Sequence, residues 1–503
     1  MLQQLNPVDV VAKARRAFNN GTTRSLQQRK KYLRSLVNFF QGQEDAIIGC
    51  VFADSRKNKE EMRLEIYMAI FHTQYLLDNV DKWVSGETVP KRWVDTLDKI
   101  YVHKEPYGVV LLIACWNKPI LSLLPLAGAI AAGNCVVIKP SHNGYNFGTF
   151  LATVLPTYLD PECYPIFFEK NDRVEKLLEE KFDYIYFTGS TSIGRMIHRA
   201  ANKYLTPTTL QLGGKNPIYI DSSADLEQAA ARIIWGKCLN SGQACSCPDY
   251  VLCSKPVRER FVEHAKSTIE RFYPDSQHCP IVNDHQLQRL SNLLKGLDIA
   301  LGGGVDFTQR TMQPTVAVNV SPNHPIMQEE IFGPILPILT VNGVEEAVNF
   351  ISRREKPLVI YVFSKKSSVK KFFIEKTSSG AVTINDTIVH AIVESLPFGG
   401  VGSSGMGRFK GKHSFDTFVN RKSVLDKNTW GIVERVNELR YPPLTKRKTD
   451  VVKFLLKYRR EPSWVTVVTS IIFLLALGAS FKLDFWILDE IVISICKTTS
   501  KKF

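Results

Sequence analysis

Between residues 99 and 202 the sequence alternates between short apolar runs and segments with helical spacing. The runs are rich in β-branched residues and too short for helices; they read VVLLIA at 109–114, CVVIK at 135–139 and DYIYFTG at 183–189. A repeat of strand and helix places the strands side by side in parallel, with helices covering the sheet. The sequence therefore predicts an α/β fold with a doubly wound, Rossmann-like parallel sheet. Further helices are expected near 144–159 and 171–181, and a further strand at 164–168.

The first 85 residues are charged and carry apolar side chains three and four positions apart. This spacing is typical of long amphipathic helices, so we expect a helical layer here; the apolar positions are Tyr32, Leu33, Leu36, Phe39, Phe40, Ile66, Ile70, Tyr75 and Leu76. The first twenty residues contain no apolar core of a secretion signal. The body of the protein is therefore expected to be cytosolic.

The composition limits the possible partners. With 503 residues, 44% of them hydrophobic and 22% charged, the chain has room for two or three domains with cores of their own. The net charge of +15 is spread along the chain apart from a C-terminal cluster, and no nucleic-acid-binding motif accompanies it. The ten cysteines include no CxxC pair, so most should be reduced and buried. We therefore expect neither nucleic acid nor a metal ion as a partner.

Polar side chains follow three of the predicted strands, at the sheet edge where such folds bind ligands. They are Trp116 and Asn117 after the first strand, Lys139 at the end of the second, and the loop 189–194 after the third. The loop resembles a phosphate-binding loop, but Arg195 stands where nucleoside triphosphate chemistry needs lysine. It is either a tight turn or an anion site at a helix N-terminus.

A cysteine in the second half of the chain has the setting of a nucleophile. Residues 236–250 read GKCLNSGQACSCPDY, in which Cys245 follows a turn of small and amide residues that could expose its thiol. A thiolate attacks a carbonyl well only if it is accessible and donors hold the resulting oxyanion. Asn117 could be one donor and the Cys245 backbone N–H the other.

Seven motifs in order resemble the aldehyde dehydrogenase superfamily over roughly residues 5–445. They are WNKP at 116–119, VVIKPS at 136–141, FTGST at 187–191, LGGKNP at 212–217, NSGQAC at 240–245, EEIFGP at 329–334 and PFGGVGSSGMG at 397–407. The run around CPDY at 247–250, SGMGRFKGKHSFDTF and RYPP at 440–443 resemble the class 3 branch, which includes the fatty aldehyde dehydrogenases.

The resemblance implies a reaction at Cys245. This residue would attack the aldehyde carbon, Asn117 would hold the oxyanion, and hydride would pass to the nicotinamide, leaving a thioester to be hydrolysed. Medium- to long-chain aliphatic aldehydes are the expected substrates, and carboxylic acids the products.

The resemblance also implies a cofactor, NAD or NADP, and the residues that hold it. Lys139 and Glu330 would hydrogen-bond the two riboses, and Phe332 would pack at the nicotinamide. Ser190 and the helix after it would face the pyrophosphate. The full expected set is Trp116, Lys139, Gly189, Ser190, Gly194, Glu330 and Phe332.

One departure from the family concerns the second half of the reaction. Where LGGK is normally preceded by a general-base glutamate, this chain has Gln211, whose amide cannot take a proton near neutral pH. General-base assistance contributes about a hundred- to ten-thousand-fold, so hydrolysis could become slow. Gln211 could still orient a water, and Glu330 could act as the base instead. Two alternatives stay open: an enzyme that passes the acyl group to coenzyme A, and a catalytically silent relative.

Further departures lie near the expected cofactor and substrate. His142 stands where the family commonly has a glutamate that favours NAD, so the preference between NAD and NADP is open. Cys115 and Lys118 flank Trp116-Asn117 in place of a proline and an aromatic residue. Phe409-Lys410 stands where class 3 members usually have Tyr-His.

The C-terminal segment predicts a membrane anchor. Residues 464–481, WVTVVTSIIFLLALGASF, carry no charge and would span about 27 Å as a helix, close to the thickness of a bilayer core. The basic stretch at 446–460 before it would keep the body cytosolic. We expect a tail anchor in the lipid bilayer, and the endoplasmic reticulum is the membrane that the resemblance implies.

Together these features predict the organisation of the chain. The resemblance implies a homodimer. The expected domains are an NAD(P)-binding domain with N-terminal helices at 1–210, a catalytic domain at 211–390, a return to the cofactor domain with a dimerisation segment at 391–445, a basic juxtamembrane segment at 446–460, a transmembrane anchor at 461–483 and a tail at 484–503.

Overall fold

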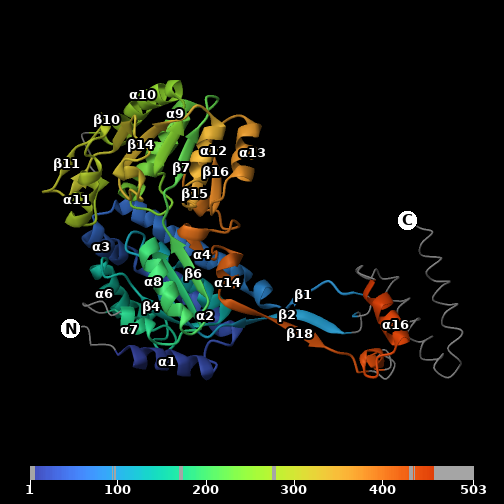
Figure 1. The fold of residues 1–503 in the computed structure, drawn as a ribbon. Helices are drawn as coiled ribbons and strands as arrows, with labels where there is room; N and C mark the ends of the chain where they lie inside the picture. The colour runs from blue at the N-terminus through green and yellow to red at the C-terminus, as the bar shows by residue number, and fades with distance from the viewer. Residues whose placement is uncertain are drawn as a thin grey trace. The chain divides into compact units, whose positions relative to one another are not determined.

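The computed structural model describes residues 6–92, 95, 98–168, 174–274, 279–429, 434 and 437–457. It divides into two compact units (Figure 1). The first comprises Met1–Trp83 and Pro106–Val419, and the second comprises Val84–Glu105 and Asn420–Phe503.

Helices form the N-terminal part of the first unit, as the apolar spacing predicts. Asn6 caps the first of them by accepting a hydrogen bond from the Val8 N–H. Leu33, Leu36 and Phe39 are buried, which confirms the amphipathic reading of this region. The helices are α1 (Pro7–Asn19), α2 (Leu26–Gly42), α3 (Glu44–Ser55) and α4 (Lys59–Val84).

A five-stranded sheet follows, in the order β17-β6-β5-β3-β4. Its strands are β3 (Val109–Ile113), β4 (Cys135–Lys139), β5 (Tyr184–Gly189), β6 (Thr208–Leu212) and β17 (Gly405–Met406). The first four run parallel and β17 is antiparallel to β6, which confirms the predicted parallel sheet. The strand expected at 164–168 is reduced to an isolated parallel bridge between Ile138 and Ile166.

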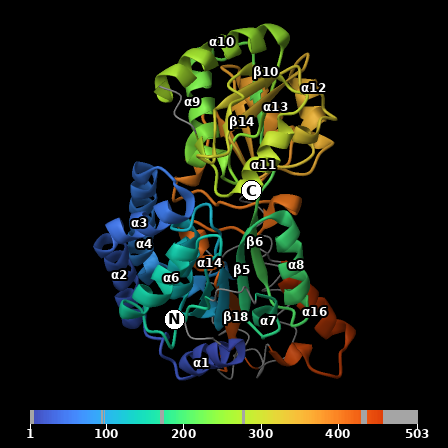
Figure 2. The same cartoon turned by 90° about the vertical axis from the view of Figure 1, so that its left-hand side faces the viewer.

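Short helices connect the strands of this sheet. The helix expected near 171–181 is present as the single short helix α7. In the view of Figure 2 the strands β5 and β6 lie between α6 and α8. The helices are α5 (Leu124–Ala132), α6 (Tyr145–Val154), α7 (Val174–Leu178) and α8 (Thr191–Asn202).

A second sheet, of seven strands, has the order β10-β13-β14-β8-β7-β15-β16. All neighbours are parallel except β10 and β13. Ile218 and Ile220 belong to one core cluster and Tyr219 between them to the other, so both faces of the sheet are buried. The strands are β7 (Pro217–Ile220), β8 (Tyr250–Cys253), β10 (Asp298–Leu301), β13 (Thr315–Val318), β14 (Ile335–Thr340), β15 (Val359–Phe363) and β16 (Ala381–Ile384).

Helices and a small sheet complete the first unit (Figure 1). The helices are α9 (Leu226–Cys238), α10 (Lys255–Phe272), α11 (Asp284–Leu293), α12 (Val344–Ser352), α13 (Ser367–Lys376) and α14 (Lys412–Asp416). The small antiparallel sheet contains β9 (Cys279–Pro280), β11 (Val305–Asp306) and β12 (Thr311–Met312). Short 3-10 helices lie at Leu121–Leu123, Leu155–Thr157, Leu239–Gly242, Pro325–Met327, Val389–Ala391 and Gly402–Ser404.

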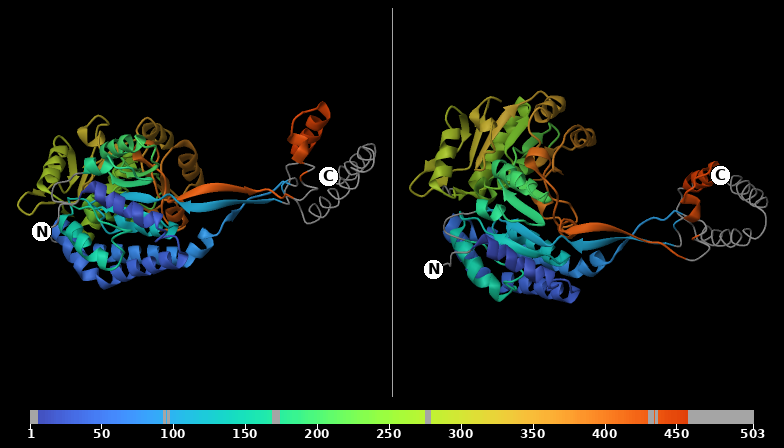
Figure 3. Two further views of the ribbon diagram at one scale, coloured as in Figure 1. Left: turned by 90° about the horizontal axis from the view of Figure 1, so that it is seen from below. Right: turned by 60° about the horizontal axis from the view of Figure 1, so that its bottom comes forward.

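The second unit contains a sheet of β1 (Glu87–Thr88), β2 (Lys99–Pro106) and β18 (Val419–Asp426). Figure 3 shows β2 and β18 side by side, and ion pairs such as Lys427 with Asp98 at 2.6 Å join the two segments. A 3-10 helix at Glu438–Arg440 and α16 (Lys446–Lys457) follow. Although β2 and β3 are consecutive in sequence, they belong to different sheets.

The predicted membrane segment at 464–481 lies outside the described residues. Within the described ranges, no helix combines the length and apolar character that crossing a bilayer requires. The domain boundaries expected from the sequence stay a prediction.

Candidate active site

The carboxyl ends of four parallel strands open into a cavity of about 840 Å³ in the first unit. Residues after β3, at the ends of β4 and β5 and within β6 line it, together with residues from the loops of the seven-stranded sheet. Nine of the ten predicted site residues therefore lie around one space: Trp116, Asn117, Lys139, Gly189, Ser190, Gln211, Cys245, Glu330 and Phe332.

Gly194 is the predicted site residue that does not line the cavity. It is buried in α8, and a Cβ atom at this position would lie 2.5 Å from the Leu212 Cδ2 atom. Its lack of a side chain lets α8 approach β6 closely, which is a packing role.

The turn before Cys245 has an unusual backbone conformation. Asn240 and Ser241 have φ angles of 51° and 58°, in the left-handed region that non-glycine residues seldom adopt. The Asn240 amide holds the turn by donating to the carbonyl oxygens of Asn117, at 2.8 Å, and Gln243, at 2.9 Å. A Cβ atom at Gly242 would lie 2.3 Å from the Gly333 carbonyl oxygen, so the turn packs directly on that loop. The result is a braced loop that presents a half-buried Cys245 to the cavity.

Asn117 connects the end of β3 to the same turn. Its amide nitrogen donates to the Gln243 carbonyl oxygen at 3.0 Å. A primary amide carries two N–H donors, and this contact uses one of them. The second N–H remains for an oxygen bound in the cavity that Asn117 lines together with Cys245.

Asn216 supports the nucleophile loop, and sequence reasoning missed this role. Its amide nitrogen donates to the carbonyl oxygens of Cys245, at 2.8 Å, and Cys247, at 2.9 Å, while its own oxygen accepts from the Val359 N–H at 3.1 Å. Asn216 is fully buried, so all three bonds lie away from water. The signal that could have found it is an asparagine inside the recognised motif LGGKNP.

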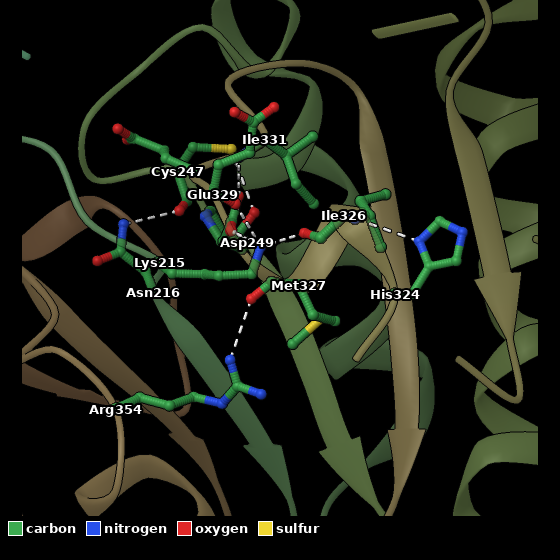
Figure 4. Close-up of polar contacts among 12 residues, drawn as sticks. Lys215, Asn216, Cys247, Asp249, His324, Ile326, Met327, Glu329, Ile331 and Arg354 are labelled. Carbon is green, nitrogen blue, oxygen red and sulfur yellow. Dashed lines mark hydrogen bonds and ion pairs between the residues drawn. The ribbon is translucent and has the colours of Figure 1, made fainter. Parts of the chain in front are cut away.

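A partly buried lysine, Lys215, fixes the loop that carries Glu330 (Figure 4). The Lys215 ammonium group donates to the Asp249 carboxylate at 2.6 Å, and to the carbonyl oxygens of Ile326 at 2.6 Å and Glu329 at 2.9 Å. The other Asp249 oxygen accepts from the Ile331 N–H at 3.1 Å. Lys215 and Asp249 therefore hold the 326–331 segment from both sides.

Removal of this cation should destabilise the fold. In the Lys215→Met variant the Asp249 carboxylate, whose side chain is only 3% exposed, loses its closest positive partner and keeps Lys237 at 3.9 Å. Removing the partner of a buried polar group costs about 1–3 kcal/mol, so we expect a loss of that size in the free energy of unfolding, measured by urea denaturation. Lys371→Met, which removes an exposed pair with Glu375, should cost about 0.5 kcal/mol or less. Equal stability of the two variants would contradict a structural role for Lys215.

The predicted cofactor residues fit a dinucleotide. Ser190 caps the N-terminus of α8 and accepts from the Ile193 N–H, so the helix end faces the cavity as an anion site. Trp116 and Phe332 meet edge to face, with ring centroids 5.7 Å apart. The buried Lys139 ammonium group contacts the Pro140 carbonyl oxygen at 3.2 Å. These residues supply the anion site, apolar surface and hydroxyl-binding groups that such a cofactor needs.

The Glu330 carboxylate has a raised pKa and an oxygen atom without a partner among the described residues. Burial raises its pKa to about 8; Asp249 adds to the increase, and the Gly214 backbone, Lys215 and Lys237 oppose it. Its Oε1 atom has no hydrogen-bond partner among the described residues. A buried polar atom of this kind marks a place for a ligand or a water.

Gln211 also has an unsatisfied atom. Its amide nitrogen makes a long contact of 3.5 Å with the Phe398 carbonyl oxygen, and its Oε1 atom, which is buried, finds no partner within the described ranges. The side chain can therefore accept a hydrogen bond from a bound molecule, but it cannot accept a proton.

The thiol of Cys245 is held mainly in its protonated form. Burial raises its pKa to about 12, Glu330 acts in the same direction, and the Lys118 ammonium group opposes both. The unusual lysine after Asn117 therefore favours the thiolate, which is the reactive form.

The raised pKa of Cys245, and the opposing effect of Lys118 on it, predict how the thiol reacts with iodoacetamide. With a pKa near 12, the alkylation rate of the cofactor-free protein should rise about tenfold per pH unit between pH 7 and 10, because the thiolate fraction does so. Lys118→Met should slow alkylation at every pH in that range, measured by intact mass. Lys371→Met, at an exposed position, is the matched control and should leave the rate unchanged. An unaltered rate in Lys118→Met would show that the ammonium group does not act on the thiol.

Comparison with known proteins shows the family of the chain. The family model described as "Aldehyde dehydrogenase family" matches residues 6–424. Aldehyde dehydrogenase family 3 member B1 of Rattus norvegicus is 44% identical over 458 residues, covering 90% of this chain and 97% of that protein. Member A2 of the same family from Mus musculus is 44% identical over 455 residues, covering 89% and 93%.

A dog protein and a bacterial structure extend the comparison. "Aldehyde dehydrogenase, dimeric NADP-preferring" of Canis lupus familiaris is 43% identical, covering 88% of this chain and 98% of that protein. The solved substrate-bound structure of Staphylococcus aureus AldH superposes with a TM-score of 0.85 at 35% identity and covers 90% of this chain and all of that one. The resemblance to the class 3 branch is therefore confirmed, and the chain belongs to the aldehyde dehydrogenase family.

Proposed function

We propose that this enzyme oxidises medium- to long-chain aliphatic aldehydes to carboxylic acids, with NAD or NADP as the hydride acceptor. The observation that carries the proposal is the meeting of Cys245 and the Asn117 amide in one cavity of about 840 Å³. Apolar side chains line much of this space, which suits an alkyl chain. They include Leu64, Met68, Leu121, Leu239, Ile388, Ile392 and Phe398.

The turn at 240–245 positions Cys245 for the first half of the reaction. The Cys245 thiolate attacks the aldehyde carbon, a C–S bond forms, and the carbonyl oxygen becomes an oxyanion. The free N–H of Asn117 and the Cys245 backbone N–H stabilise that charge. Bound NAD or NADP would supply the hydride acceptor needed to oxidise the thiohemiacetal to a thioester. Glu330 and Lys139 line the cavity where they can hold ribose hydroxyls.

The second half of the reaction admits another acyl acceptor. Because Gln211 cannot take a proton, hydrolysis lacks the base that the family normally has at this position. A thiol such as coenzyme A would then compete with water for the acyl group, and the product would be an acyl thioester. This is the alternative function that the presence of Gln211 favours.

The C-terminal sequence supports a place for the enzyme at a membrane. The uncharged stretch at 464–481, preceded by the basic residues of 446–460, suits a tail anchor with the catalytic body in the cytosol, at the endoplasmic reticulum. Long-chain aldehydes partition into lipid, so an anchored enzyme would meet them at high local concentration. A homodimer is part of the proposal, in keeping with the word "dimeric" in the description of the dog relative.

The test uses the full chain in detergent micelles. Aldehydes of increasing chain length are mixed with NAD or NADP, reduced cofactor is followed from milliseconds to minutes, and intact mass records acylation of Cys245. Sustained turnover that improves with chain length supports the proposal, and acceleration by coenzyme A with an acyl-CoA product supports the alternative. No burst and no adduct would indicate a silent relative and contradict both.

A further inference from the structure

Three buried polar atoms find no hydrogen-bond partner in the part of the chain that the structure describes, and their residues line the cavity with Cys245. They are Tyr186 Oη, Gln211 Oε1 and Glu330 Oε1. Tyr186 is 1% exposed and Gln211 is 4% exposed, so solvent outside the cavity cannot satisfy them. Unsatisfied atoms are uncommon in folded proteins, and three in one cavity indicate that a small polar molecule binds there.

The sheet places two of these groups on one face. Gln211 in β6 pairs in register with Thr188 in β5, and Tyr186 lies two residues before Thr188. Alternate residues of a strand point to the same side, so the side chains of Tyr186 and Gln211 emerge from adjacent strands in the same direction. Tyr186 and Cys245 line the same cavity.

Glu330 reaches the end of β6 from a loop of the other sheet. A Cβ atom at Gly213, two residues after Gln211, would lie 2.1 Å from Glu330 Oε2, so the carboxylate rests against the glycine backbone. The Lys215–Asp249 pair holds the segment that carries Glu330 (Figure 4). The fold therefore holds the carboxylate against the residue that directly follows β6.

The three atoms offer the bonds that a water molecule can make. Tyr186 provides an O–H donor, Gln211 Oε1 an acceptor and Glu330 Oε1 an acceptor that can also take a proton. A buried water typically makes two to four hydrogen bonds, and this set supplies three.

We propose that Glu330 is the proton acceptor for hydrolysis of the Cys245 thioester, and that Gln211 and Tyr186 hold the attacking water. This inference rests on the proposed function, because it presupposes an acyl group on Cys245. The water oxygen bonds to the thioester carbon while its proton passes to Glu330 Oε1. The C–S bond then breaks, the electrons return to sulfur as the thiolate, and the carboxylic acid leaves.

The surroundings of Glu330 suit the role of a base. Several charged and titratable groups face it or its backbone, namely Lys215, Lys237, Cys245, Asp249, Arg289 and Glu329. Together with burial they leave a pKa of about 8, higher than that of an ordinary glutamate, so the ionised form is a stronger base. Hydrolysis should accelerate as the pH rises through about 8, because only the carboxylate form accepts the proton.

The test separates this role from cofactor binding. A p-nitrophenyl ester acylates Cys245 without any cofactor, so the full chain in detergent can be acylated with p-nitrophenyl acetate while nitrophenolate is followed. After removal of excess ester, intact mass records the loss of the acetyl group. The burst measures acylation, and the decay of the adduct measures hydrolysis.

The expected result is a slower decay of the adduct without a slower burst. Glu330→Gln should make the burst as fast as in the wild type or faster, because the charge that raises the Cys245 pKa is removed. The same variant should slow the decay about a hundred- to ten-thousand-fold, with loss of the rise near pH 8. Tyr186→Phe should slow the decay about fivefold, the value of one hydrogen bond. Glu330→Gln combined with Gln211→Glu should recover the decay, with its pH dependence moved to lower pH. Glu345→Gln, an exposed carboxylate on α12, is the control and should behave as wild type.

The outcomes that contradict the proposal differ from those that contradict the proposed function. A normal burst with wild-type decay in Glu330→Gln would overturn the role of Glu330 and leave the nucleophile in place. The absence of a burst in the wild-type protein would overturn both, because no acyl group would form on Cys245.

Discussion

Cys245→Ala should lose aldehyde oxidation, with kcat reduced by on the order of a million-fold, as when the nucleophile of another covalent enzyme is removed. The reason is that the C–S bond holds the substrate carbon at the site of hydride transfer. Stopped-flow measurement of reduced cofactor with a long-chain aldehyde checks the rate, and intact mass checks that no acyl adduct forms. Cofactor binding, followed by fluorescence titration, should persist.

Cys247 provides a matched control for this prediction. It lies two residues from Cys245, its pKa is also raised to about 12 by burial, and its thiol contacts the Lys237 carbonyl oxygen at 3.7 Å. It does not line the cavity. Cys247→Ala should therefore retain the burst and the adduct on Cys245. A comparable loss in both variants would mean that packing of the loop, and not the thiol, limits the reaction.

Asn117→Ala should lower the rate of acylation by about a hundred- to a thousandfold, which corresponds to about 2.7–4 kcal/mol of transition-state stabilisation. The amide has one N–H on the Gln243 carbonyl oxygen and a second available to the oxyanion. Asn117→Asp is the sharper variant, because it keeps the shape and replaces the donor with a negative charge. The burst rate with p-nitrophenyl acetate measures the effect without the cofactor.

The same amide has a structural task, so a second measurement is needed. Removal of its bond to Gln243 could also loosen the turn at Asn240. Alkylation of Cys245 by iodoacetamide, which forms no oxyanion, should be little changed in Asn117→Ala if the turn holds its shape. An equal loss of alkylation and acylation would show that Asn117 acts through the loop and not on the oxyanion.

Two departures from the family pattern change groups that line the cavity. Lys118 opposes the effect of burial on the Cys245 pKa, and Gln211 keeps an unsatisfied acceptor in the cavity that Glu330 also lines. Both substitutions act on proton transfer, one before acylation and one after it. A chain that has changed both is expected to differ from its relatives in the pH dependence of its rates more than in the chemistry that it performs.

The sequence was sufficient to predict the sheet and its edge. The apolar runs at 109–114, 135–139 and 183–189 became β3, β4 and β5 because a strand buried on both faces must be apolar throughout. The run at 164–168 lies along β4, where Pro165 O and Phe167 N bond to Ile138, but the ladder does not extend because Pro165 has no N–H to donate. Local pattern determines which segments can form strands, but neighbours determine whether they do.

The candidate residues were also visible in the sequence, since motifs retain residue type and order. The interactions between these residues were not visible in the sequence. The Lys215–Asp249 pair joins positions 34 residues apart, and the Asn117 bond to Gln243 joins positions 126 apart. The sequence assigned Gly194 to the cofactor, whereas its place in the structure is against Leu212.

The sequence by itself determined the chemical groups of the site and the strand ends that carry several of them. Only the tertiary structure decided that Tyr186 lines the same cavity as Gln211 and Glu330, because the spacing of residues along a chain does not show which side chains of neighbouring strands face a common space. It also decided the pKa values, since burial and the charges around Cys245 and Glu330 arise from residues distant in sequence.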